Sequence, residues 1–145
     1  MKLAAESHVD HHLNDQHIAW LLERFGDRTR FFAETVAIPP ELPALPCALH
    51  GPAMGDEPVP DAECRQVVRN GREGPSRVCS RSSRDVRIIT VIAGPFGDEP
   101  CVLYTAYGGP LAPREPWDLA LVALVGREMA ESVAFWAQHA LSEAS

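Results

Sequence analysis

The sequence predicts an α+β fold in which an antiparallel meander of three to four strands is packed by an N-terminal helix and a C-terminal helix. Three segments support this prediction. Residues 15–25 have the apolar spacing of an amphipathic helix, residues 86–93 form an almost continuous β-branched apolar run, and residues 118–142 again have helical spacing. Because the helical segments flank the β-prone ones instead of alternating with them, the pattern favours α+β over βαβ units.

The first helix is expected in "NDQHIAWLLERFG". Asn14 or Asp15 can cap its N-terminus, and Gly26 is suited to end it. Residues 29–38, which follow, fit either a second short helix or an extended segment. The apolar residues that recur at helical spacing are Ile18, Leu21, Leu22 and Phe25.

Residues 39–60 hold seven of the 13 prolines, a density that excludes a helix interior and a central strand. We therefore expect an ordered loop here, whose apolar residues, such as Leu45 and Leu49, pack on the body of the protein. Neither side of this loop alone has enough residues for an adequate core. Residues 1–145 are accordingly predicted to form a single domain.

The strands are expected after this loop. β-prone residues on both sides of Asn70-Gly71 predict a hairpin, because this dipeptide favours tight turns. Residues 86–93 predict a core strand, and residues 101–107 its partner after a short glycine–proline turn. Strict alternation along the partner strand places Thr105 and Tyr107 on the same face as Leu103. The apolar stripe of the C-terminal helix consists of Leu121, Val122, Val125, Met129, Val133 and Trp136.

Composition and charge exclude several classes of protein. The formal net charge of −7 argues against a general nucleic-acid coat, and no apolar run approaches the roughly 20 residues of a membrane-spanning helix. The N-terminal residues lack the apolar core of a secretory signal, so we expect a cytoplasmic protein with no membrane partner. The four cysteines form no C-x-x-C pair, which is typical of buried free thiols and not of a zinc ribbon.

Positive charge is concentrated in residues 65–87, which contain seven arginines and two acids. Such a stripe on an acidic chain indicates one anionic partner bound at one place, such as RNA. The alternative is a solvated hairpin face whose arginines pair with acids elsewhere in the chain. The arginines predicted to contact the RNA backbone are Arg77, Arg81 and Arg87.

Two groups of residues could carry out chemistry. His8 and His12 are four residues apart, so on a helix they would share a face and could bind a metal or transfer protons. A surface segment that binds metal only adventitiously is the alternative. Thr105 and Tyr107 lie at a strand end just before "GGP", where two hydroxyls can donate to a phosphate. Ordinary strand pairing is the alternative for this pair.

A histidine segment before an amphipathic helix, a central apolar strand, and a strand that ends in "TAY" together resemble the ribonuclease A-like toxin domains of bacterial contact-dependent inhibition systems. They resemble more loosely the wider group of small bacterial RNases. The resemblance covers about residues 8–25 and 87–107. It implies metal-independent RNA cleavage without a cofactor, or RNA binding by a relative that has lost catalysis. The active-site residues that it implies are His12 or His8, Arg24, Thr105 and Tyr107.

Two other functions are compatible with the sequence. The chain could be a non-enzymatic module that meets a protein partner through Trp117 or Trp136, since tryptophan is enriched at binding hot spots. It could instead be a metal-binding domain built on the N-terminal histidines. Removal of metal would destabilise only the metal-binding domain.

Overall fold

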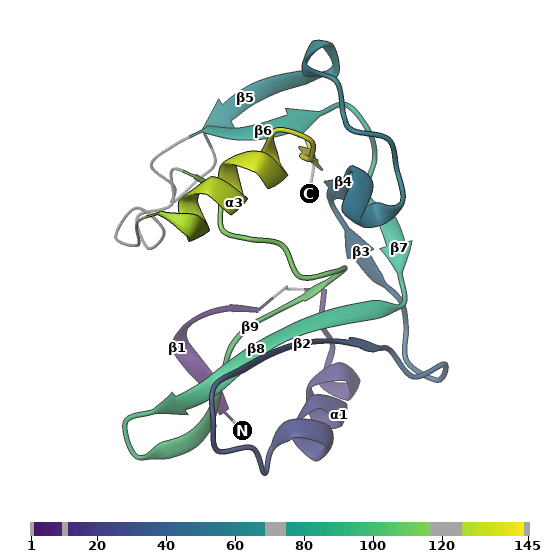
Figure 1. Ribbon diagram of the computed structural model, residues 1–145. Coiled ribbons are helices and arrows are strands. Elements are labelled where there is room, and N and C mark those ends of the chain that lie inside the picture. The colour runs from purple at the N-terminus through teal and green to yellow at the C-terminus, as the bar shows by residue number, and fades with distance from the viewer. Residues whose placement is uncertain (1, 10–11, 69–74, 117–125, 144–145) are drawn as a thin grey trace. The chain divides into compact units, whose positions relative to one another are not determined.

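The computed structural model describes residues 2–9, 12–68, 75–116 and 126–143, and the chain divides into two compact units (Figure 1). Residues 1–47 and 85–111 form the first unit, and residues 48–84 and 112–145 form the second. We describe each unit by itself, and the single-domain organisation stays a prediction. The helices and strands are β1 (Lys2–Val9), α1 (Asp15–Phe25), β2 (Phe32–Ala37), β3 (Leu45–Cys47), β4 (Leu49–His50), β5 (Cys64–Val68), β6 (Pro75–Cys79), β7 (Arg84–Val86), β8 (Ile88–Phe96), β9 (Glu99–Gly108), α3 (Arg127–Trp136) and β10 (Ala140–Ser142).

Helix α1 has the bounds that the sequence predicts, because its local signals agree. The Asn14 side chain accepts a hydrogen bond from the His17 backbone N–H at 3.0 Å, and His17 Nδ1 accepts one from the Asn14 N–H at 3.1 Å. With Nδ1 acting as an acceptor, Nε2 of the fully buried His17 carries the proton and donates to the Pro43 carbonyl at 2.9 Å. This bond ties α1 to the start of the proline-rich segment.

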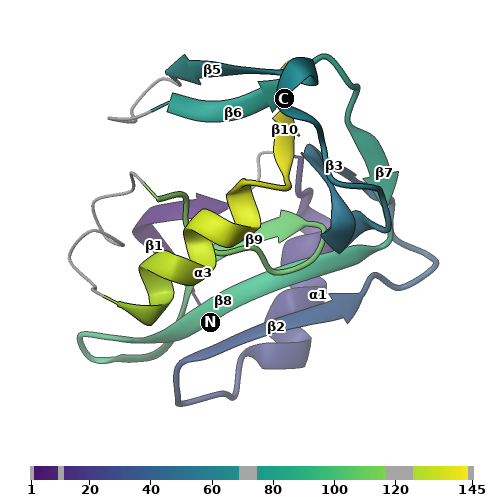
Figure 2. The same ribbon diagram turned by 45° about the horizontal axis from the view of Figure 1, so that its top comes forward.

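The first unit contains a four-stranded mixed sheet with the order β1-β9-β8-β2. β8 pairs with β9 and β2 in the antiparallel sense, and β1 is parallel to β9. The sheet and α1 lie against one another in both views (Figures 1 and 2). The α+β class and the adjacency of the two core strands are thereby confirmed, and residues 32–37 form a strand and not a second helix. The core between α1 and the sheet consists of Leu21, Phe25, Ile38, Leu42, Leu45, Ile89, Val91, Leu103 and Ala106.

The second unit has its own four-stranded sheet, with the order β4-β10-β6-β5. The predicted hairpin is present as the antiparallel pair of β5 and β6, and its Asn70-Gly71 turn lies outside the described residues. The hairpin does not extend the sheet of β8 and β9, as a continuous meander would require. The reason is that β6 pairs with β5 on one edge and with β10 on the other, so it offers no edge to β8.

The proline-rich segment is ordered, as predicted, and contains short pieces of regular structure. β3, β4 and a single 3-10 turn at Pro52–Met54 lie in it, and a second 3-10 turn, Asp61–Glu63, follows directly after it. Gly51 has φ 132°, and a Cβ there would lie 2.6 Å from the ring of His139. Glycine is therefore required at this turn.

The C-terminal helix is shorter than predicted. α3 ends at Trp136, and Ala140–Ser142 forms β10 instead of continuing the helix, because these residues pair with both β4 and β6. Residues 118–125 of the predicted helix lie outside the described residues. Val133 of the predicted apolar stripe is 53% exposed, whereas Ser132 is buried. Ser132 and Trp136 donate to the carbonyls of Arg114 and Pro113, so their side of the helix faces the segment before it.

Candidate functional site

A β-bulge determines where the predicted hydroxyl pair points. Ile92 pairs with Thr105 and Ala93 pairs with Leu103, so Tyr104 is an extra residue in β9. The bulge breaks the strict alternation that the sequence predicts, because it reverses the face of every residue after it. Thr105 and Tyr107 still share a face with each other. They no longer share it with Leu103, which packs in the core under α1.

Helix α1 and its Arg24 lie on the face of the sheet opposite to Thr105 and Tyr107. Ala106 pairs with Val91, and both belong to the core that α1 covers. Thr105 and Tyr107 therefore point to the side away from α1. Arg24 is exposed in the last turn of α1, with its guanidinium 5.4 Å from the centre of the Phe25 ring. The structure therefore does not bring Arg24 together with the two hydroxyls, although the resemblance implies one active site for all three.

The two candidate histidines are placed differently. His8 lies in β1, and its backbone is in parallel register with Thr105 on β9. His12 is exposed in the turn between β1 and α1. The sheet thus brings His8 next to Thr105 in the backbone ladder, and of the predicted site residues only His8, Thr105 and Tyr107 belong to the sheet itself.

The sheet face opposite α1 has a row of hydroxyl groups, and we call it the hydroxyl face. Thr35, Thr90 and Tyr107 lie side by side on β2, β8 and β9. Thr90 Oγ1 donates to the Gly109 carbonyl at 2.8 Å, so it accepts its second hydrogen bond, also 2.8 Å long, from the exposed Thr35 hydroxyl. Tyr107 is half-buried beside this pair.

An exposed aromatic residue lies at the other end of the hydroxyl face. Phe31 directly precedes β2 and is 66% exposed. A Cβ added at Gly94 would lie 3.0 Å from Phe31 Cα and 3.3 Å from Cδ2 of its ring, so Gly94 allows this aromatic side chain to approach β8. Arg30 precedes Phe31 and is also exposed. Arg28 instead pairs with Glu34 at 2.8 Å and stacks on the Phe25 and Phe32 rings.

The three arginines predicted to contact the RNA backbone are each engaged in contacts within their own unit. Arg77 donates to the carbonyls of Val59 and His139 and pairs with Asp61, and its side chain is only 15% exposed. The guanidinium of Arg81 contacts Glu63 through two nitrogens, at 2.8 and 3.1 Å. Arg87 belongs to the first unit, where it donates to the carbonyls of Pro39 and Leu42. These contacts favour the alternative in which the arginines pair within the chain.

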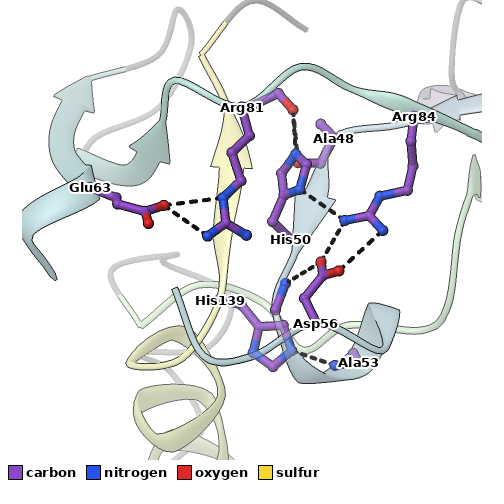
Figure 3. A network of polar contacts seen from close by, with 10 residues as sticks. Ala48, His50, Ala53, Asp56, Glu63, Arg81, Arg84 and His139 are labelled. Carbon is purple, nitrogen blue, oxygen red and sulfur yellow. Dashed lines mark hydrogen bonds and ion pairs between the residues drawn. The ribbon is translucent and has the colours of Figure 1, made fainter. Parts of the chain in front are cut away.

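A polar network around the buried His50, in the second unit, was not predicted from the sequence (Figure 3). His50 is 3% exposed; its Nδ1 lies 3.0 Å from Arg84 Nη2 and its Nε2 lies 2.9 Å from Ser142 Oγ. Arg84 also pairs with Asp56 at 2.5 Å. An arginine can only donate, so His50 Nδ1 is the acceptor and Nε2–H donates to Ser142. Ser142 Oγ in turn donates to the Ala48 carbonyl at 3.3 Å.

The pKa shifts of His50 and Asp56 agree with these hydrogen-bond directions. Burial is the main cause that lowers the pKa of His50, and the Arg84 and Arg81 charges lower it further. The hydrogen bond from Arg84 is the main cause that lowers the pKa of Asp56. His50 is therefore neutral near pH 7, with its lone pair directed at Arg84.

The serine, histidine and aspartate of this network do not form a nucleophile triad. A serine nucleophile needs a histidine nitrogen with a free lone pair to take its proton. Nε2 of His50 carries a proton here, and Arg84 stands between His50 and Asp56, so the histidine cannot pass a proton to the carboxylate. The network holds β4, β10 and the turn after Gly51 together. No sequence signal joins its members, since Ser142 is 92 residues from His50.

The residues singled out for the two alternative functions lie partly outside the described part of the chain. Trp136 donates its indole N–H to the Pro113 carbonyl at 3.1 Å and packs on Phe135, while Trp117 lies outside the described residues. Among the residues that the structure places, no cluster of three or more histidine, cysteine or acidic side chains could hold a metal ion. None of the placed helices is long and apolar enough to span a membrane.

Comparisons with known proteins identify no relative. No family model, curated protein or solved structure matches this chain.

Proposed function

We propose that this chain is a small RNase-like protein that binds single-stranded RNA on the hydroxyl face of its first unit. The observation that supports this most directly is the position of Phe31, which is 66% exposed at one end of the face that displays Thr35 and Tyr107. An exposed aromatic ring offers a stacking platform that accepts any base. The Thr35 hydroxyl donates its hydrogen to Thr90, but its oxygen can still accept a hydrogen bond from a ribose 2′-hydroxyl.

The charges near this face fit a single local contact with RNA. Arg30 is exposed next to Phe31, whereas the Arg28 charge is neutralised by Glu34. With a net charge of −7 over the chain, we expect weak binding that depends on few phosphate contacts. Arg77, Arg81 and Arg87 have no role in this proposal, because each is engaged within its own unit.

Binding is favoured over cleavage by the position of Arg24. A phosphorane-like transition state needs a cation beside the hydroxyls. Arg24 lies on the other side of the sheet, so the set of groups that the resemblance implies is not assembled. The proposed function is therefore RNA binding by a relative that has lost catalysis.

Fluorescence anisotropy with a labelled single-stranded RNA of about 12 nucleotides tests this proposal. Phe31→Ala should weaken binding roughly 5- to 150-fold, which corresponds to the loss of one stacked base at about 1–3 kcal/mol. Arg30→Gln should make the salt dependence shallower by about one unit of log Kd per log salt. The matched control is Val68→Ala, because Val68 is equally exposed but belongs to the second unit.

Two outcomes would contradict the proposal. Wild-type protein that shows no anisotropy change in dilute buffer does not bind RNA. Phe31→Ala protein that binds as well as wild type would place the RNA elsewhere.

Incubation with a mixed RNA pool, with and without EDTA, separates binding from cleavage. Cleavage that is lost in Tyr107→Phe, and in His8→Ala or His12→Ala, would restore the catalytic role that the resemblance implies.

A further inference from the structure

Two of the four cysteines occupy directly opposite positions in the β5–β6 hairpin of the second unit. Cys64 is the first residue of β5 and Cys79 is the last residue of β6, and their Cα atoms are register partners. Both belong to one small apolar cluster with Val59 and Ala140, so their side chains lie on the same face of the hairpin. Both are present as free thiols.

The backbone hydrogen bonds show which kind of cross-strand pair this is. The Cys79 carbonyl accepts from the Glu143 N–H at 3.0 Å, so it points away from β5. The Cys64 N–H donates to the Asp61 carbonyl of the preceding 3-10 turn, so it does not donate to Cys79. The two cysteines thus form a non-hydrogen-bonded pair, the type in which the Cα atoms of opposite residues are closest, at about 4.5 Å. Disulfides span Cα separations of about 4.4–6.8 Å.

We propose that Cys64 and Cys79 are an oxidisable pair that closes into a cross-strand disulfide by exchange with a low-molecular-weight disulfide such as oxidised glutathione. The Cys64 thiolate attacks one sulfur of the oxidant, forms a mixed disulfide and releases one thiol. The Cys79 thiol then loses its proton and attacks Cys64 Sγ, which forms the Sγ–Sγ bond and releases the second thiol. Two protein thiols are oxidised and one disulfide is reduced.

The exposure of the two thiols assigns their roles. Cys64 is half-buried and can meet the oxidant, whereas Cys79 is 2% exposed and can act only on a sulfur already attached to its neighbour. Burial raises the pKa of the Cys64 thiol. Exchange should therefore be slow at neutral pH and faster as the pH rises, since the thiolate is the attacking species.

Closure of the pair would stabilise the second unit. The bond closes a loop of about 15 residues, which includes the Asn70-Gly71 segment, and restricts the unfolded chain. It also fixes β5 to β6, the strand that carries β10 on its other edge. The remaining two cysteines, Cys47 and Cys101, lie in the first unit and serve as internal controls.

The test is oxidation of the native protein with oxidised glutathione at about pH 8. We expect the number of free thiols to fall from four to two, the intact mass to decrease by about 2 Da, and a peptide that joins residues 64 and 79 to appear on digestion. The thermal midpoint should rise by roughly 5–10 °C and return after treatment with dithiothreitol.

Variants show whether the pair itself is responsible. Cys64→Ser should retain all its other thiols without a loss of mass, whereas Cys101→Ser should still lose two thiols. If Cys79→Ser does not fold, the half-exposed Cys64→Ser variant alone provides this comparison. A stable glutathione adduct on Cys64 that never resolves would overturn the proposal, and so would a mapped disulfide that involves Cys47 or Cys101.

Discussion

Acidification from pH 8 to pH 5 should destabilise the second unit through His50. In the folded protein this ring is 3% exposed, and Arg84 donates to its Nδ1 at 3.0 Å. Protonation would break that bond and place two cations in contact. Burial, Arg84 and Arg81 accordingly lower the pKa of His50, against a smaller opposing effect of Asp56.

The sign of the pH effect follows from the two states. Above pH 6.5, the usual pKa of an unfolded histidine, His50 is neutral in both states and contributes no pH dependence. Below pH 6.5 the unfolded chain gains a proton that the folded protein does not bind, so the free energy of unfolding falls. The slope for one proton is at most about 1.4 kcal/mol per pH unit, and it ends once the pH passes the lowered folded pKa. The lowered pKa of Asp56 acts in a separate window, below about pH 4.

Urea denaturation at half-unit intervals of pH, followed by circular dichroism, measures this effect. His50→Gln keeps a donor and an acceptor but does not titrate. At pH 8 it should be less stable than wild type, because the contacts of the imidazole ring with Arg84 and Ser142 are lost. The gap should narrow by up to about 1.4 kcal/mol per unit below pH 6.5. Leu22→Ala, at an exposed position that does not titrate, should leave the pH dependence of the wild-type protein unchanged. Parallel profiles for wild type and His50→Gln would refute the assignment of a buried neutral imidazole beside Arg84.

Two further predictions concern stability and are also measured by urea denaturation. Leu21→Ala should lower the free energy of unfolding by about 2–5 kcal/mol, because Leu21 is fully buried under the sheet. Leu22→Ala, at a 41% exposed position, should lower it by less than about 1 kcal/mol. Equal losses would place the core on another face of α1. Arg77→Gln should lower the free energy of unfolding by about 2–4 kcal/mol, because two carbonyls lose their donor. Arg81→Gln breaks an exposed ion pair and should lower it by about 1 kcal/mol or less. Arg77→Gln protein as stable as wild type would contradict the structural role of this arginine.

The sequence predicts a helix or strand well where its capping residues and its apolar periodicity all lie within one short segment. The cap at Asn14, the apolar spacing of α1 and Gly26 all lie within one short segment, so the bounds of the helix follow from it. The β-branched run of β8 likewise specifies a core strand, and the short turn after it specifies its partner β9. The α+β class follows from the order of these elements.

Sequence alone did not determine which side chains meet. The bulge at Tyr104 reverses the face of Thr105 and Tyr107, and a single extra residue in a strand has no pattern that distinguishes it from regular alternation. Arg24 is consequently separated from the hydroxyls that the predicted site requires.

The sequence also did not determine which charged and polar side chains pair with one another over longer distances along the chain. Seven arginines in residues 65–87 appear as one stripe in the sequence, but Arg77 and Arg87 donate to carbonyls in different units. The His50 network joins Arg84 and Ser142 across 34 and 92 residues. Local propensity and periodicity act over a few residues and therefore specify the helices and strands. Hydrogen bonds and ion pairs form only after strands distant in the chain have paired, so the tertiary structure alone decides the partners of these side chains.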